Sequence, residues 1–258
     1  MNTRRIICIF LLLGIIPFSL YAQLWKLRRY EASFSICTSQ CYGDIGGSAD
    51  ANNLYGLKDI QILQTRPSFA FGARYKLTGD MAVKMNLIYG FIAGNDKGSR
   101  NEERNYSFNS TIFEPSFQFE YYLIPEKRSE GSSALARHKA MVNNFAKIYL
   151  YVFGGVGGAM INPKLQDGGG NIVPMDNFSK FNLVIPMGVG LKFSLDSKWS
   201  IGFELGRRFT TTDYIDGYSS ISSKSNDIYD IGMFSAIYKI PTDRRGRPII
   251  GRATRYRR

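Results

Sequence analysis

The stretch RPSFAFGARYKLTGDMAVKMNLIYG, residues 66–90, decides the fold class, because its side chains alternate between two kinds. Large apolar residues such as Phe69, Phe71 and Met85 stand at every second position. Small, polar or charged residues such as Arg74 and Lys84 stand between them. Successive side chains of a β-strand point to opposite faces. The stretch therefore predicts two antiparallel strands, each with one apolar and one polar face, joined by a tight turn at Thr-Gly-Asp.

The same alternation recurs along the chain and predicts eight strands. Besides the opening pair, the predicted strands span residues 30–42, 108–123, 148–161, 181–195, 199–209 and 227–240. Residues 54–65 would raise the number to ten if they also formed a strand. In the strand at 148–161, Tyr149, Tyr151 and Phe153 share one face.

The connections between the predicted strands alternate in length. The turns after the second and sixth strands are tight. The connections after the first, third, fifth and seventh strands are long and rich in Gly, Asn, Asp and Ser. Short turns at one end and long loops at the other are typical of membrane barrels. The connection at 124–147 should be short but is not, and residues 133–143 are predicted to form a helix. The predicted fold is therefore an all-β, up-and-down antiparallel transmembrane β-barrel of eight strands, with a short helical periplasmic insert.

Periodicity alone does not separate a membrane barrel from a soluble barrel of the lipocalin kind, which would turn its apolar face inward. The length of the predicted strands and the aromatic content of 14% favour the membrane. Aromatic residues also stand at strand ends, where the two bilayer interfaces would lie. These residues are Tyr75, Tyr121, Tyr122, Trp199 and Phe209.

The polar faces of the strands would then point into the barrel. An eight-stranded barrel is just wide enough for side chains to fill it, and unpaired charges buried there would be costly. We therefore expect a plugged interior held by a lumen ion-pair network. Its members are Arg74, Lys84, Glu114, Glu120, Lys192, Glu204 and Arg208.

The first residues are predicted to be a signal peptide. Arg4 and Arg5 precede a long apolar run, and Ala22 offers a cleavage site. A retained membrane anchor is the alternative, but the run is short for a span and contains Pro17. The predicted organisation is a signal peptide at 1–22, a barrel at 23–240 with the insert at 124–147, and a basic periplasmic tail at 241–258.

The chain is strongly basic, with 33 Lys and Arg against 21 Asp and Glu. The excess gathers at the end that holds the short turns and both termini, which faces the periplasm in such barrels. A nucleic-acid arm, a lipid-phosphate-binding tail and a docking tail for a periplasmic protein all fit this composition. An exported protein rarely meets nucleic acid, so we discount the nucleic-acid arm. We favour docking and keep the lipid-phosphate-binding tail as the alternative. The candidates are Lys26, Arg28, Arg29, Arg244, Arg245, Arg247, Arg252, Arg255, Arg257 and Arg258.

Motifs that carry catalysis or metal binding are missing from the sequence. GGVGGAM at 154–160 lacks the spacing of a dinucleotide-binding loop, and the one histidine, His138, has no plausible nucleophile near it. Cys37 and Cys41 are four residues apart on one strand, too far to bridge without a bend, so we expect free thiols. We predict no catalytic residue, no metal site and no cofactor.

Several motifs together resemble a known family. YGDIGGS after the first strand, the stretch from Arg66 through GNDK, and IGFELGRRFTTTDYIDGYS resemble the PorG-like outer-membrane barrels of the Bacteroidota type IX secretion system. The resemblance covers most of residues 30–240. It implies a non-catalytic outer-membrane protein that anchors periplasmic ring or lipoprotein subunits of a secretion complex. A small-solute channel or ligand-binding porin is the alternative, and a surface adhesin is a third.

Overall fold

The computed structural model describes residues 28–46, 64–99, 101–124, 148–174, 178–219, 226–243 and 246–249. Within these ranges the chain forms eight strands and a short 3-10 helix, η5 (Glu102–Arg104). The strands are β1 (Tyr30–Tyr42), β2 (Arg66–Lys76), β3 (Met81–Asn95), β4 (Ser107–Tyr122), β5 (Ile148–Gln166), β6 (Phe181–Ser194), β7 (Trp199–Thr210) and β8 (Ile228–Ile240).

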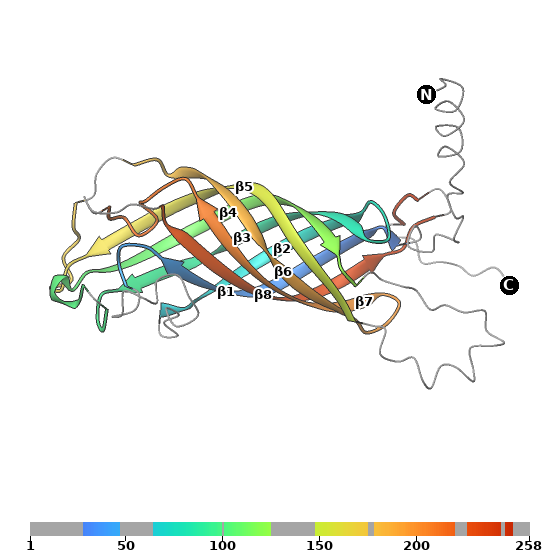
Figure 1. Cartoon of the computed structure of the whole chain (residues 1–258), viewed down its shortest axis with the longest axis horizontal. Helices are drawn as coiled ribbons and strands as arrows, with labels where there is room; N and C mark the ends of the chain where they lie inside the picture. The colour runs from blue at the N-terminus through green and yellow to red at the C-terminus, as the bar shows by residue number, and fades with distance from the viewer. Residues whose placement is uncertain are drawn as a thin grey trace, which may run out of the picture.

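The strands form a tilted cylinder with two different ends (Figure 1). One end, here called the terminal end, carries the β2–β3 and β6–β7 turns, the start of β1 and the end of β8. The opposite end, here called the loop end, carries the other described connections, between β3 and β4, β5 and β6, and β7 and β8. This difference between short turns and longer loops is the one that the sequence predicts.

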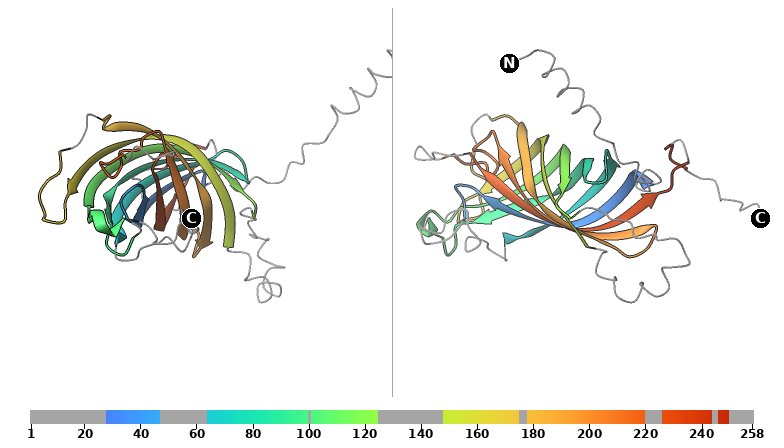
Figure 2. Two further views of the ribbon diagram at one scale, coloured as in Figure 1. Left: turned by 60° about the vertical axis from the view of Figure 1, so that its left-hand side comes forward. Right: turned by 45° about the vertical axis from the view of Figure 1, so that its right-hand side comes forward.

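The sheet is closed. Each strand pairs antiparallel with its neighbours in sequence, and β8 pairs with β1 along its whole length. Figure 2 shows the strands wrapping around one axis. Closure satisfies the backbone groups of both edge strands, as a structure that spans lipid requires. The predicted fold class is confirmed, and the bounds of β1, β4, β6, β7 and β8 agree with the prediction to within one residue.

β5 is longer than the sequence predicts. The prediction ends it at residue 161, before Asn162-Pro163, but the strand continues to Gln166. Pro163 lies opposite Ser110 of β4, and the Asn162 amide donates to the Ser110 hydroxyl at 3.3 Å. The buried alternation also continues from Ile161 to Leu165. Pro163 is itself buried, so it continues the alternation of the strand although it donates no backbone hydrogen bond.

The outer face of the barrel is apolar and unpacked. Large hydrophobic side chains stand exposed along every strand, including Phe71 at 62%, Phe117 at 57% and Leu205 at 68%. Most charged residues of the same strands are buried inside, such as Glu31, Arg74 and Glu204. This is the reverse of a soluble barrel, whose apolar face lines the interior. The barrel is therefore of the transmembrane kind, with its apolar face directed at lipid.

The interior has two layers. The half toward the loop end is filled by an apolar layer made of Ile88, Ile92, Phe108, Ile112, Ile161, Leu165, Val184, Ile231 and Met233. The half toward the terminal end is filled by an ionic layer made of Glu31, Arg74, Lys76, Lys84, Glu120, Lys192 and Glu204. The sequence predicts the ionic layer but not the apolar one.

The aromatic face of β5 points into the barrel. Tyr149, Tyr151 and Phe153 are all at most 5% exposed, whereas Val152 and Val156 face outward. The prediction that aromatic faces point to lipid is therefore wrong for β5. It is also wrong for Tyr122, which is buried inside the barrel. The rings fit inside because glycines on β6 and β7 leave room for them. A Cβ on Gly188 or Gly206 would lie 2.7 Å from the Phe153 ring.

Several predictions fall outside the described residues. These are the signal peptide at 1–22, the helical insert at 133–143 and the extra strand within 54–63. Among the described residues, no helix is long and apolar enough to cross a membrane.

A short hairpin follows β8, where the sequence predicts only a basic tail. Thr242 and Pro248 form an isolated antiparallel bridge, and the Ile249 amide donates to the Pro241 carbonyl at 2.9 Å. The Asp243 carboxylate accepts the Arg247 amide at 2.9 Å, and Gly246 takes a φ of 78° that favours glycine. These bonds therefore join the described residues 241–243 and 246–249 of the tail, and Arg247 is exposed.

Candidate functional site

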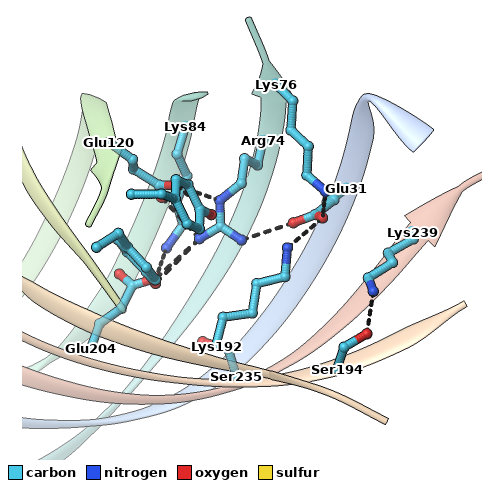
Figure 3. Close-up of polar contacts among 12 residues, drawn as sticks. Glu31, Arg74, Lys76, Lys84, Glu120, Lys192, Ser194, Glu204, Ser235 and Lys239 are labelled. Atoms are coloured by element: carbon cyan, nitrogen blue, oxygen red, sulfur yellow. Dashed lines mark hydrogen bonds and ion pairs between the residues drawn. The ribbon is translucent and has the colours of Figure 1, made fainter. Parts of the chain in front are cut away.

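Arg74 is the centre of the ionic layer. It projects inward from β2, and Figure 3 shows its guanidinium between carboxylates of three other strands. Its Nη1 donates to Glu31 of β1 at 2.9 Å, and its Nη2 donates to Glu120 of β4 at 2.9 Å. Glu204 of β7 lies 3.5 Å from Nη2. One planar cation therefore ties four strands together across the lumen, as a guanidinium with five donors can.

Lysines surround the carboxylates that Arg74 binds. The Glu31 carboxylate also receives Lys76 at 2.9 Å and Lys192 at 2.6 Å. Glu204 receives Lys84 at 2.5 Å and the Tyr151 hydroxyl at 2.7 Å. All these side chains are at least nine-tenths buried. Buried charges are tolerated when each is paired and hydrogen-bonded. Each charge named here has an ionic partner, although Oε2 of Glu204 accepts no hydrogen bond.

A second ionic contact lies deeper, where the two layers meet. Glu114 of β4 accepts the Tyr229 hydroxyl at 2.7 Å, and its Oε2 lies 3.6 Å from Nε of Arg208. Arg208 also donates to the Gly206 carbonyl at 2.5 Å. Both charged residues are fully buried. This pair is looser than the Arg74 contacts, but it still brings opposite charges together across the lumen.

The structure places all seven predicted lumen residues inside the barrel. Five of them, Arg74, Lys84, Glu120, Lys192 and Glu204, belong to the ionic layer, and Glu114 and Arg208 form the deeper pair. Three inward charges were missed, namely Glu31, Lys76 and Lys239, whose ammonium donates to the Ser194 hydroxyl at 2.5 Å. All three lie within two residues of a strand end, and their place in the alternation is the signal that would have identified them.

The loop end is covered by a lid, here defined as residues 43–46 and 211–218. Ile45 and Ile215 are buried and pack against the apolar layer. Asp96, at the end of β3, anchors the first part: it accepts the Gly46 amide at 3.1 Å and Nε of Arg104 at 2.8 Å. Arg104 in turn donates to the Asp44 carbonyl at 2.7 Å. The lid therefore covers the apolar layer on the side that faces the loop end, and the ionic layer lies on its other side.

The docking candidates at the terminal end are placed only in part. Arg28, Arg29 and Arg247 are described, and the others lie outside the described residues. Arg29 donates to the Tyr75 hydroxyl at 2.9 Å, and its backbone carbonyl accepts the Lys76 amide. Arg29 is therefore engaged in holding the rim of the barrel. Arg247 is exposed on the hairpin after β8.

The described residues offer no arrangement for metal chemistry. No group of three or more His, Cys, Asp or Glu among them could hold a metal ion. Cys37 and Cys41 are free and buried inside the barrel, as the spacing predicts. Inward side chains fill the lumen and cross-link it, so the surfaces left for recognition are the two ends and the lipid-facing side.

Comparisons with known proteins add a family and a set of similar folds. The family described as "Domain of unknown function (DUF6089)" matches residues 33–237. No curated protein matches the sequence. The chain is similar to the Pseudomonas aeruginosa outer membrane protein OprG, with a TM-score of 0.43, 8% identity, and coverage of 83% of this chain and 97% of OprG. It is also similar to Ail of Yersinia pestis, with a TM-score of 0.41, 14% identity, and coverage of 81% and 98%.

Proposed function

The chain belongs to the family described as Domain of unknown function (DUF6089). We propose that it is a non-catalytic outer-membrane barrel that anchors periplasmic components of a type IX protein secretion complex. In this proposal the terminal end faces the periplasm. A periplasmic ring or lipoprotein subunit binds there through acidic side chains. The support comes from the sequence motifs, the filled lumen and the charge of the terminal end.

The observation that carries the proposal is that side chains fill the lumen in both halves. An ionic layer and an apolar layer follow each other along the barrel axis, and the lid covers the second. A barrel filled in this way suits a structural role better than transport. Its partners must then bind outside the lumen, at an end or on the lipid-facing surface.

The chemistry of the terminal end favours an acidic partner. The hairpin after β8 holds Arg247 at the surface, and Arg244 and Arg245 stand at neighbouring positions in the sequence. Guanidinium groups bind carboxylates in bidentate fashion. A partner surface rich in Asp and Glu would therefore complement this end.

Charge reversal at the two ends tests the anchor. The variant Arg244→Glu, Arg245→Glu, Arg247→Glu changes the terminal end, and Lys97→Glu, Lys164→Glu, Lys180→Glu makes the same change in charge at exposed positions of the loop end. Each lost surface pair weakens binding by about 0.2–1 kcal/mol, so three lost pairs lower affinity by about tenfold. We expect the first variant alone to lose its partners in affinity purification from gently solubilised outer membranes, quantified by mass spectrometry.

Equal partner recovery with both variants would contradict docking through the tail. Recovery of the barrel alone with the unchanged protein would contradict the anchor itself. Both variants should show the unchanged shift in gel migration between heated and unheated samples, which reports a folded barrel.

Conductance measurements separate the anchor from the small-solute channel. We expect no steady ion conductance when the purified barrel is inserted in planar bilayers between pH 5.5 and 8.5. The ionic layer blocks the lumen at every pH in this range, because its carboxylates are each bound by at least one cation. Insertion is checked by flotation of the folded protein with the same lipid. A stable open current would favour the channel instead.

A further inference from the structure

Two buried carboxylates hold the lid in place. Asp216 accepts the Ile45 amide at 3.0 Å through Oδ2 and the Tyr218 amide at 2.9 Å through Oδ1. Asp227 accepts the Ile215 amide at 2.8 Å through Oδ2. Ile45 and Ile215 are the two buried isoleucines of the lid, and both belong to the cluster that forms the apolar layer. Each of these isoleucines is therefore attached by its backbone to one carboxylate.

The two carboxylates lie next to each other. The position that a Cβ on Gly43 would occupy is 2.7 Å from Oδ2 of Asp216 and 2.8 Å from Oδ1 of Asp227. Both residues are almost fully buried, at 0% and 2% exposure. Like charges this close in a buried place repel each other unless a proton neutralises one of them.

The surroundings add negative charge to the pair. The titratable groups that act on it are Asp44 from the β1–β2 connection, Asp213 from the lid and Cys41 from β1. Among the residues that the structure describes, Arg104 touches the lid, and it donates to Asp96 and to the Asp44 backbone. Because the positive charge of Arg104 is paired with Asp96, we expect a bound proton to neutralise one carboxylate of the pair.

We propose that Asp216 and Asp227 form a proton-operated latch on the lid. The lid is closed while the pair holds a proton, and it loosens when both carboxylates ionise. The inference goes beyond the anchoring function and does not depend on it, because it concerns the loop end alone.

The direction of the pH effect follows from burial. Burial, opposed by bonds from backbone amides, raises the pKa of Asp216 to about 7. Burial and then the neighbouring Asp216 raise the pKa of Asp227 well above its usual range. A carboxyl group whose pKa is higher in the closed state binds more protons there, so closure is favoured below its ordinary pKa of about 3.9. This stabilisation is lost as the pH rises through 7, and the lid opens on the alkaline side.

Cys41 provides a native reporter of the lid. It belongs to the same buried cluster as Ile45 and Ile215 and is 7% exposed. The full-length folded protein is labelled with N-ethylmaleimide at pH 5.5 and pH 8.5, and modification of Cys41 is mapped by peptide mass spectrometry. Wild type is compared with Asp227→Asn at each pH, so that the part of the pH dependence that both proteins share cancels. The amide variant keeps an oxygen for the Ile215 amide but cannot ionise.

We expect wild type and Asp227→Asn to be labelled at equal rates at pH 5.5. At pH 8.5 the wild type should be labelled about tenfold faster than Asp227→Asn. Asp167→Asn changes a carboxylate in the β5–β6 connection, outside the lid, and should behave like wild type.

Two results would overturn the latch. One is that wild type and Asp227→Asn label Cys41 at nearly the same rate at pH 8.5. The other comes from Ile45→Ala, which removes the side chain that covers the cluster and should raise Cys41 labelling at both pH values. Unchanged labelling of Ile45→Ala would show that the lid does not control access to the apolar layer.

Discussion

Replacing Arg74 with Met lowers the free energy of unfolding of the barrel by about 3–5 kcal/mol, the cost of leaving buried charges without their partner. Glu120 loses both of its contacts with the guanidinium and keeps only the Tyr122 hydroxyl at 3.1 Å. Glu31 and Glu204 keep their lysines. The measurement is urea unfolding of the folded protein in lipid vesicles, followed by tryptophan fluorescence.

The matched control is another arginine on the same barrel. Arg207 of β7 binds Asp230 of β8 through two bonds of 2.8 Å, but both side chains are about one-third exposed. An exposed pair contributes about 0–1 kcal/mol. Arg207→Met should therefore lower stability by less than about 1 kcal/mol. Equal losses for the two variants would show that burial in the lumen is not what makes Arg74 important.

A second substitution identifies the group that Arg74 neutralises. If the stranded charge is that of Glu120, then Arg74→Met combined with Glu120→Gln should recover part of the lost stability, because an amide is less costly to bury than an unpaired carboxylate. A double variant that is no more stable than Arg74→Met would mean that Arg74 acts through packing or through its other partners.

The sequence predicts the strands well because their two faces differ in chemistry. Along β2, Arg74 stands between Ala73 and Tyr75, and a period of two assigns it to the face opposite the aromatics. Once the apolar face is assigned to lipid, the lumen position of each central charge follows. Alternation does not tell which inward charges touch, because contacts across the lumen depend on strand tilt and stagger. The four strands that meet at Arg74 are therefore a finding of the structure.

The apolar layer could not be predicted from the same rule. At Ile88 of β3 and Ile112 of β4 both faces of the strand are apolar, so alternation of polarity vanishes there. The inward direction of the β5 aromatic side chains could not be predicted for the same reason. Val152 and Tyr151 are both apolar in the pattern, so polarity does not tell which of them faces inward. The lid was likewise beyond prediction, since it depends on hydrogen bonds between loops that are far apart in the sequence.

Replacing Gly190 with Ala destabilises the barrel by about 3 kcal/mol, although the same change usually stabilises a strand. A Cβ at Gly190 of β6 would overlap the ring of Tyr151 on β5. The ring cannot move freely, because its hydroxyl donates to Glu204 at 2.7 Å. Overpacking in a core costs about 1–3 kcal/mol, and loss of a hydrogen bond to a charged group costs a similar amount.

The control for Gly190 is Gly154, which lies on β5 with open space around the position of its missing Cβ. Gly154→Ala should stabilise the barrel by about 0.5 kcal/mol, because alanine loses less backbone entropy on folding than glycine. The two substitutions are chemically identical, so the opposite signs report the Tyr151 ring alone. In a Tyr151→Ala background, Gly190→Ala should then cause no further loss of stability. If Gly190→Ala is as harmless as Gly154→Ala, the ring is not confined as the structure has it, and the ionic layer would tolerate movement of Tyr151 away from Glu204.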